Sequence, residues 1–108
     1  MIEAVLDRKN LRLTMEGHAG GGEKGHDLVC AAATALAYTL AGNVAKLCAE
    51  DKRHVRRPVL VLEEGHAEIA CDAVHGMQAV AELVFDSVCM GFELLAQRYP
   101  ENIKFSII

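Results

Sequence analysis

Two residues of this 108-residue chain have the types and spacing needed for nucleophilic catalysis: a histidine, and a cysteine twelve positions later. Cys30 could attack a carbonyl carbon as a thiolate, while His18 takes the thiol proton and then donates it to a leaving amine. His18 lies in the segment Gly17–Asp27, which holds five glycines. We expect this segment to be a loop, because each glycine costs backbone entropy to fix. Such a loop could bring the imidazole to the thiol.

The residues around Cys30 predict a helix that begins just before it. Asp27 is a favourable N-cap residue, and Leu28–Leu47 is rich in alanine and leucine. Cys30 then falls in the first turn, where unpaired amide groups and the helix dipole favour a thiolate and could stabilise an oxyanion. Thr34 lies one turn further along the same face, where its hydroxyl could contact the thiolate or a substrate.

Each of these residues has a second interpretation, which the sequence leaves open. Asp27 could orient His18 instead of capping the helix, and Thr34 could hydrogen bond to a carbonyl of its own helix. His26 competes with His18 as the base. Cys30 could be a buried structural residue. A metal ion could also bind between the cysteine, the two histidines and the aspartate, although their spacing lacks the paired ligands of zinc motifs. We predict no metal and no cofactor.

The composition limits the class of protein. The length fits one domain, which we take as residues 1–108. A net charge of -4 argues against a nucleic-acid-binding surface, so we expect no direct nucleic acid partner. A local basic cluster is most simply a solvent-exposed loop; it consists of Lys52, Arg53, Arg56 and Arg57.

The apolar segments and the cysteines indicate a cytoplasmic protein without a membrane span. Met1–Leu13 lacks the basic start and the apolar stretch of a signal peptide. Leu28–Ala45 is uncharged, but it is marginal in length for a span and rich in alanine, which favours a packed interior helix. The cysteines are widely spaced and we expect them to be thiols in a reducing compartment; they are Cys30, Cys48, Cys71 and Cys89.

Hydrophobic periodicity predicts five strands and two helices. The strands are expected at Ile2–Leu6, Leu11–Glu16, Val59–Glu63, Ala67–Cys71 and Ile103–Ile108, and the second helix at Val74–Tyr99, which Pro100 stops. The order strand-strand-helix-strand-strand-helix-strand predicts an α+β domain: a mainly antiparallel five-stranded sheet with two helices packed on it. The first helix is uncharged until Lys46, so a second subunit could supply part of its cover.

The residues around the histidine and the cysteine form a motif that resembles a known family. The motif is Gly17-His18-Ala19 followed by Gly25-His26-Asp27-Leu28-Val29-Cys30-Ala31-Ala32. Two further stretches share the resemblance, His75-Gly76 at the start of the second helix and Tyr99-Pro100-Glu101-Asn102-Ile103 near the end. Over nearly its whole length the chain is similar to the ribosomal-processing cysteine proteases called Prp.

The resemblance implies a cysteine endopeptidase that forms homodimers. Its family removes a short N-terminal extension, after a pair of phenylalanines, from the large-subunit ribosomal protein numbered twenty-seven in Firmicutes and related bacteria. By position, Cys30 is the nucleophile and His18 the base, and the supporting or substrate-binding residues are Asp27, Thr34, Gly17 and Gly25. Position 34 departs from the family pattern, because the resemblance implies serine where this chain has Thr34. We expect the added methyl group to narrow the pocket. The implied partner is the ribosomal protein precursor, with no membrane involved.

Two other functions remain as alternatives to proteolysis. One is a non-catalytic, ribosome-associated binding module that would use the same segment to grip a partner. The other is a thiol or metal sensor. For the protease, we expect the glycines at 20–22 to let the loop hold His18 away from Cys30 until a substrate orders it.

Overall fold

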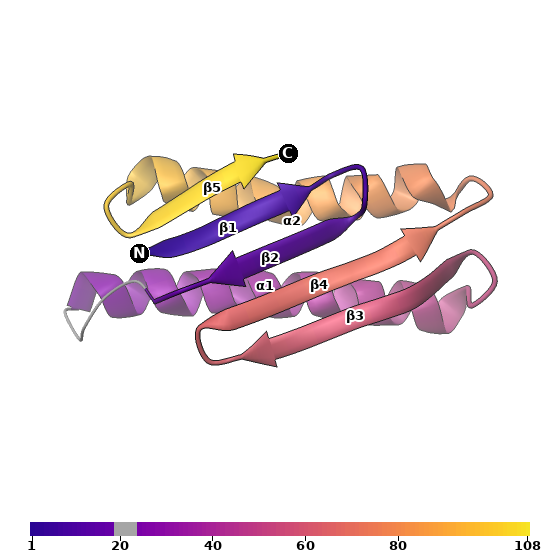
Figure 1. Cartoon of the computed structure of the whole chain (residues 1–108), viewed down its shortest axis with the longest axis horizontal. Helices are drawn as coiled ribbons and strands as arrows, with labels where there is room; N and C mark the ends of the chain where they lie inside the picture. The colour runs from indigo at the N-terminus through magenta and orange to yellow at the C-terminus, as the bar shows by residue number, and fades with distance from the viewer. Residues whose placement is uncertain (19–23) are drawn as a thin grey trace.

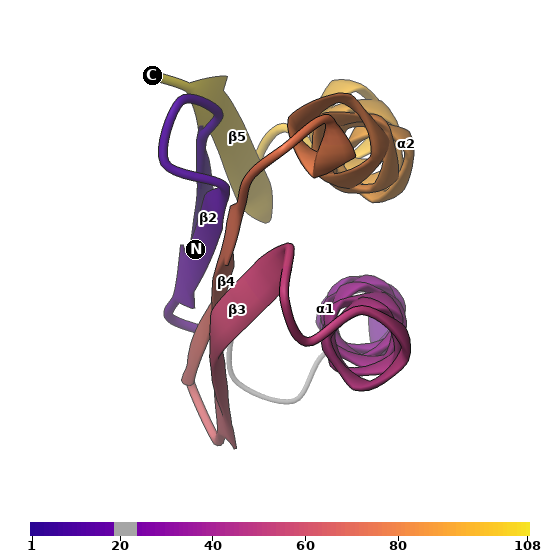
Figure 2. The same ribbon diagram turned by 90° about the vertical axis from the view of Figure 1, so that its right-hand side faces the viewer.

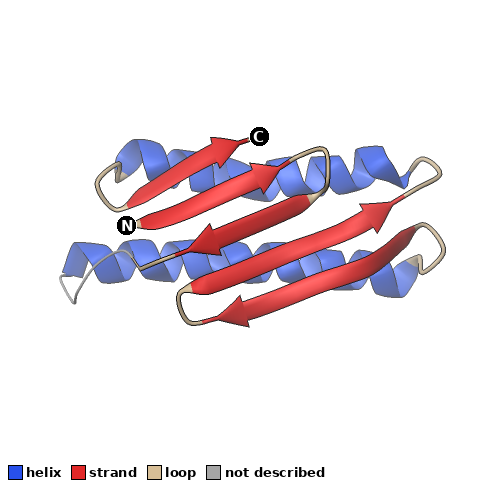
Figure 3. Cartoon of the chain, in the orientation of Figure 1, coloured by secondary structure: helices blue, strands red, loops and turns tan. Residues whose placement is uncertain are grey.

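The computed structural model describes residues 1–18 and 24–108, with residues 24–27 described through their backbone alone. Within these residues the strands are β1 (Ile2–Asp7), β2 (Arg12–Glu16), β3 (Val55–Glu63), β4 (His66–Ala73) and β5 (Ile103–Ile107). The helices are α1 (Lys24–Glu50) and α2 (Met77–Arg98). Their order along the chain is the predicted one, as Figures 1 and 3 show.

The strands form one mixed sheet in the order β3-β4-β2-β1-β5. Three neighbouring pairs are antiparallel, and β1 and β5 are parallel. Both helices cover the same face of the sheet, and none of the described residues forms a helix on the opposite face (Figure 2). The predicted α+β class, with a mainly antiparallel five-stranded sheet and two helices packed on it, is therefore confirmed.

Alternation along the strands supplies one half of the core. Ile2, Ala4 and Leu6 of β1 are buried toward the helices, while Glu3 between them is exposed on the open face. The helices supply the other half through one stripe each. These buried helical residues are Val29, Ala33, Ala37, Leu40, Ala41 and Val44 in α1 and Ala81, Phe85, Cys89 and Phe92 in α2. The small alanines let α1 lie close to the sheet.

The helix α1 begins at Lys24, so the predicted cap at Asp27 is wrong. Asp27 lies in the first turn, and Cys30 is the seventh residue of the helix instead of the third. The sequence was ambiguous because acidic residues favour the first turn as well as the cap. A glycine inside a helix costs only about 1 kcal/mol, so Gly25 did not prevent the longer helix. The predicted loop is thus wrong for residues 24–27, and the glycines at 20–22 lie outside the described residues.

Two other predicted boundaries shift for identifiable reasons. The strand β3 begins at Val55, so the basic residues Arg56 and Arg57 belong to a strand instead of a loop, although both stay exposed. A register shift between Arg56 and Val59 accommodates Arg57, which has a φ of 53° and pairs with Asp72 at 2.6 Å. The helix α2 starts at Met77, later than predicted, because the two residues before it have left-handed backbone conformations.

The segment Leu28–Glu50 of α1 is long and apolar enough to cross a membrane by those two criteria. Core helices of soluble proteins also meet these criteria, so the finding is weak evidence for a span. In the structure one side of α1 packs against α2, β3 and β4. The apolar window of α1 is 33% buried within this chain, so the predicted interior helix is confirmed along one side only.

Candidate active site

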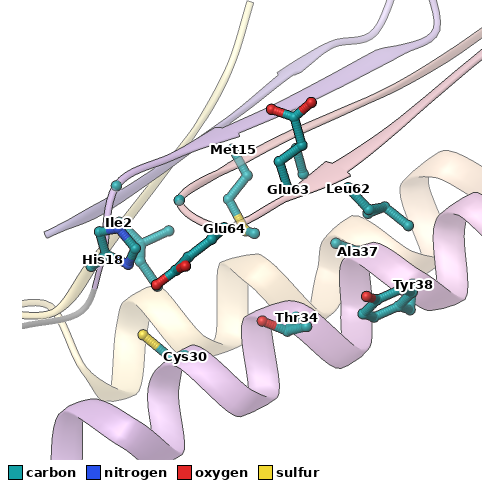
Figure 4. Close-up of a pocket in the computed structure, with 13 residues that line it drawn as sticks. Ile2, Met15, His18, Cys30, Thr34, Ala37, Tyr38, Leu62, Glu63 and Glu64 are labelled. Atoms are coloured by element: carbon teal, nitrogen blue, oxygen red, sulfur yellow. The ribbon is translucent and has the colours of Figure 1, made fainter. Parts of the chain in front are cut away.

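A cleft of about 320 Å³ opens between the N-terminal half of α1 and the ends of β2 and β3. Cys30 and His18 both line it, although they come from different elements of the fold (Figure 4). Its volume suits a few substrate side chains. The other lining residues are Ile2, Met15, Gly17, Thr34, Ala37, Tyr38, Leu62, Glu63, Glu64, Gly65 and Ala67.

Of the four cysteines, Cys30 is the one that lines this cleft. Cys30 comes directly after the fully buried Val29 in α1. Its half-buried side chain points into the cleft (Figure 4). Burial raises the pKa of Cys71 to about 11 and that of Cys89 to about 12, which disfavours the thiolate form of both. Burial also raises the pKa of Cys48. Position in the fold therefore separates Cys30 from the three other cysteines.

The position of Cys30 in the helix changes one part of the predicted chemistry. As the seventh helical residue it lies beyond the first turn, where the unpaired amide groups are found. The predicted oxyanion site made of first-turn amides therefore does not form around Cys30. Thr34 and Tyr38 follow Cys30 by one and two turns, and their hydroxyl groups line the same cleft.

His18 lies two residues after the end of β2 and is exposed. Its carbonyl oxygen accepts a hydrogen bond from the Met1 amino nitrogen at 2.6 Å. Gly17 before it has a φ of 96°, and a side chain at that position would collide with the carbonyl oxygen of Met1. The backbone that carries the imidazole is therefore held against Met1, directly before β1, and this close approach requires glycine at position 17.

The structure brings some of the predicted site residues together and leaves others undescribed. Gly17, His18, Cys30 and Thr34 all line the cleft. Gly25 and Asp27 lie in the first turn of α1, and the side chains of His26 and Asp27 lie outside the described residues. Among the described residues, no group of three or more His, Cys, Asp or Glu side chains is placed to hold a metal ion.

The remaining histidines lie away from this cleft. The Nδ1 of His54 lies 3.0 Å from Asp51, and its ring contacts the ring of His75 edge-on. The Nδ1 of His66 lies 2.5 Å from Glu16 on the open face of the sheet. These contacts give the three histidines surface and packing roles.

Sequence reasoning missed several residues of the cleft. Tyr38 could have been found, because it follows Cys30 by two turns on the same helix face. Glu64 could not, because it comes from the turn between β3 and β4. In Figure 4 its carboxylate points toward the space between His18 and Cys30, while Glu63 points away. The apolar wall formed by Met15 and Leu62 also depends on how the sheet is paired.

A small α+β domain that presents a thiol and an imidazole to one cleft is built like a thiol-dependent hydrolase. The chain belongs to the cysteine protease Prp family, because the model of that family matches residues 1–104. The ribosomal processing cysteine protease Prp of Staphylococcus aureus (strain Mu50 / ATCC 700699) is 27% identical over 92 residues, which are 85% of this chain and 81% of that protein.

Solved structures have the same fold. SMU.848 from Streptococcus mutans matches with a TM-score of 0.65 at 27% identity, covering 100% of this chain and 94% of that one. The ribosomal processing protease Prp from S. aureus, crystallised with a substrate peptide, matches with a TM-score of 0.64 at 23% identity, covering 100% of both chains. The family membership suggested by the motif and the fold predicted from the hydrophobic periodicity are therefore confirmed.

Proposed function

We propose that this chain is a cysteine endopeptidase that removes the N-terminal extension of a bacterial large-subunit ribosomal protein, the one numbered twenty-seven, and so supports ribosome maturation. The observation that carries the proposal is the position of Cys30 and His18, which come from different elements and line one cleft. The ribosomal processing role of the S. aureus relative supports the same conclusion.

In the proposed reaction Cys30 is the nucleophile and His18 is the base. The imidazole takes the thiol proton, the sulfur bonds to the scissile carbonyl carbon, and a tetrahedral oxyanion forms. The intermediate collapses to a thioester as the amine leaves with the proton from His18. Water, deprotonated by the imidazole, then cleaves the thioester and restores the thiol. Thr34 is our candidate donor to the oxyanion, because its hydroxyl lines the cleft one turn from the sulfur.

The walls of the cleft support a substrate with bulky apolar residues. Met15 and Leu62 provide an apolar surface, and Tyr38, which is 58% exposed in the free chain, offers an aromatic ring. Aromatic side chains gain most from such contacts, through both their large area and ring packing. A pair of phenylalanines before the cut, as the resemblance implies, fits this surface.

We also propose that the protein acts as a homodimer in the cytoplasm. The outer surface of the two helices carries large exposed side chains, which single soluble domains seldom gather on one side. Leu28 is 66% exposed on α1, and Leu83 is 67% exposed on α2. Between the helices lies an apolar groove lined by residues that include Leu36, Gly91 and Leu94. A second copy would cover this surface, and the presence of four thiols without a disulfide fits a reducing compartment.

The test is cleavage of the immature precursor. The purified chain is incubated with the precursor and with a peptide that spans its phenylalanine pair, and mass spectrometry identifies the products. Cys30→Ala and His18→Ala should each abolish the release of the extension. Cys48→Ala is the matched control, because it removes a thiol from the same helix outside the cleft. Cleavage by Cys30→Ala would show that the assignment is wrong. A wild-type chain that binds the precursor without cutting it would favour the binding-module alternative.

A further inference from the structure

The imidazole of His18 packs against the turn that joins β3 to β4. The contact is made at Gly65, where a methyl group on Cα would lie 2.7 Å from Nε2 and 3.1 Å from Cε1 of the ring. Real carbon atoms do not approach a ring this closely, so any side chain at position 65 would move the imidazole. Gly65 also has a φ of 75°, which favours glycine for a separate reason.

Two further contacts tie this turn to the segment that carries His18. The amide nitrogen of Gly17 donates a hydrogen bond to the carbonyl oxygen of Gly65, at 2.9 Å. On the open face, Glu16 and His66 are register partners of β2 and β4, and their side chains meet at 2.5 Å. Glu16 and Gly17 are thus joined to Gly65 in the turn and to His66 directly after it, so the turn and the backbone that leads to His18 are held together.

We propose that the turn between β3 and β4 orients the imidazole of the general base, His18, and that Gly65 is a positioning residue for it. The inference rests on the proposed function, because the position of the ring matters for turnover only if His18 is the base. His18 is exposed, so burial does not fix its ring. The flat surface of a glycine lets the ring lie against the backbone at the edge of the cleft that also contains Cys30. A displaced ring would still leave the walls of the cleft intact, so substrate binding should change less than turnover.

The test compares two glycines that both have a positive φ. Gly76, at the start of α2, has a φ of 88° and no neighbouring atom within 4 Å of an added methyl group. Asparagine tolerates a positive φ, so the backbone cost of Gly65→Asn and Gly76→Asn should be similar. Of the two substitutions, only Gly65→Asn crowds His18. For precursor cleavage we expect Gly65→Asn to lower kcat about 10- to 100-fold with little change in KM. Gly76→Asn should stay close to wild type. Equal activity of the two variants would overturn the inference.

A second measurement does not depend on activity or on the folding of a variant. In the wild-type chain, NMR should detect a nuclear Overhauser effect between the Hα protons of Gly65 and Hε1 of His18. Absence of this signal in the folded chain would overturn the inference. If the signal is present but the wild-type chain cleaves no precursor, the proposed function is wrong while the packing of His18 on the turn stands. The two failures are therefore distinguishable.

Discussion

Gly91 of α2 lies against Leu36 of α1 so closely that a methyl group on its Cα would stand 2.5 Å from Leu36 Cδ2. This contact brings the two helices together on the sheet. In Gly91→Ala the cost of overpacking, about 1–3 kcal/mol, exceeds the helix-propensity gain of about 0.5–1 kcal/mol, so the fold should be destabilised by about 1–2 kcal/mol. Urea denaturation followed by circular dichroism measures the free energy of unfolding.

A second helical glycine provides the control for this substitution. Gly42 of α1 has nothing within 4 Å of an added methyl group. Gly42→Ala should stabilise the chain by about 0.5–1 kcal/mol, because alanine loses less backbone entropy in a helix. If both substitutions shift stability in the same direction, close packing at Gly91 is not the reason for its glycine.

The predictable parts of the fold are those that depend on local patterns. Alternation in Leu11–Glu16 predicted β2, and the three-four spacing of apolar residues predicted most of α2. The parallel pairing of β5 with β1 was outside the reach of such patterns, because it depends on where the chain returns after α2 crosses the sheet. The start of α1 was missed because the same residue types suit a cap and a first turn.

The candidate site also contains residues that local patterns predict and residues that they do not. The spacing of Cys30, Thr34 and Tyr38 along one helix carries a local signal, although only the first two were chosen. The turn at Glu64 and Gly65 carries none, because it reaches His18 only through the pairing of β2 with β4. Residues distant in sequence that meet through sheet register cannot be read from either segment alone.

Thr34 should contribute to turnover through its hydroxyl group. Thr34→Val keeps the shape and removes the donor, so kcat for precursor cleavage should fall about 10²-fold or more, as when other enzymes lose one oxyanion donor. Thr34→Ser keeps the donor and should retain activity. Thr14→Val on β2, where the side chain lies outside the cleft, is the isosteric control. Full activity of Thr34→Val would exclude the hydroxyl from the reaction.

The buried thiols of Cys71 and Cys89 should make stability fall in alkali. Their pKa values are raised from 9.0 to about 11 and about 12, chiefly by burial. Above pH 9 the unfolded chain loses these protons and the folded chain keeps them. Their stabilising contribution is therefore complete below pH 9 and is lost as pH rises toward the folded pKa values. Each thiol contributes a slope of about 1.4 kcal/mol per pH unit within this window.

Urea denaturation at several pH values between about 8.5 and 10.5 measures this slope. The double variant Cys71→Ala, Cys89→Ala is the comparison, because it removes the two thiols and leaves the lysines and tyrosines that also titrate in this range. Its stability should fall less steeply with pH than that of the wild type. Identical slopes would show that the two thiols ionise equally in the folded and unfolded chains.

The outer surface of the helices should hold two copies together. Leu94 lies in the groove between α1 and α2 and is 55% exposed in the single chain. Leu94→Glu places a charge where a second copy would bury it, so sedimentation equilibrium should show a monomer while the wild type sediments as a dimer. Ile107→Glu is the control, because Ile107 is 57% exposed on β5, away from this groove. A monomeric wild type, or a Leu94→Glu variant that remains a dimer, would rule out this surface as the interface.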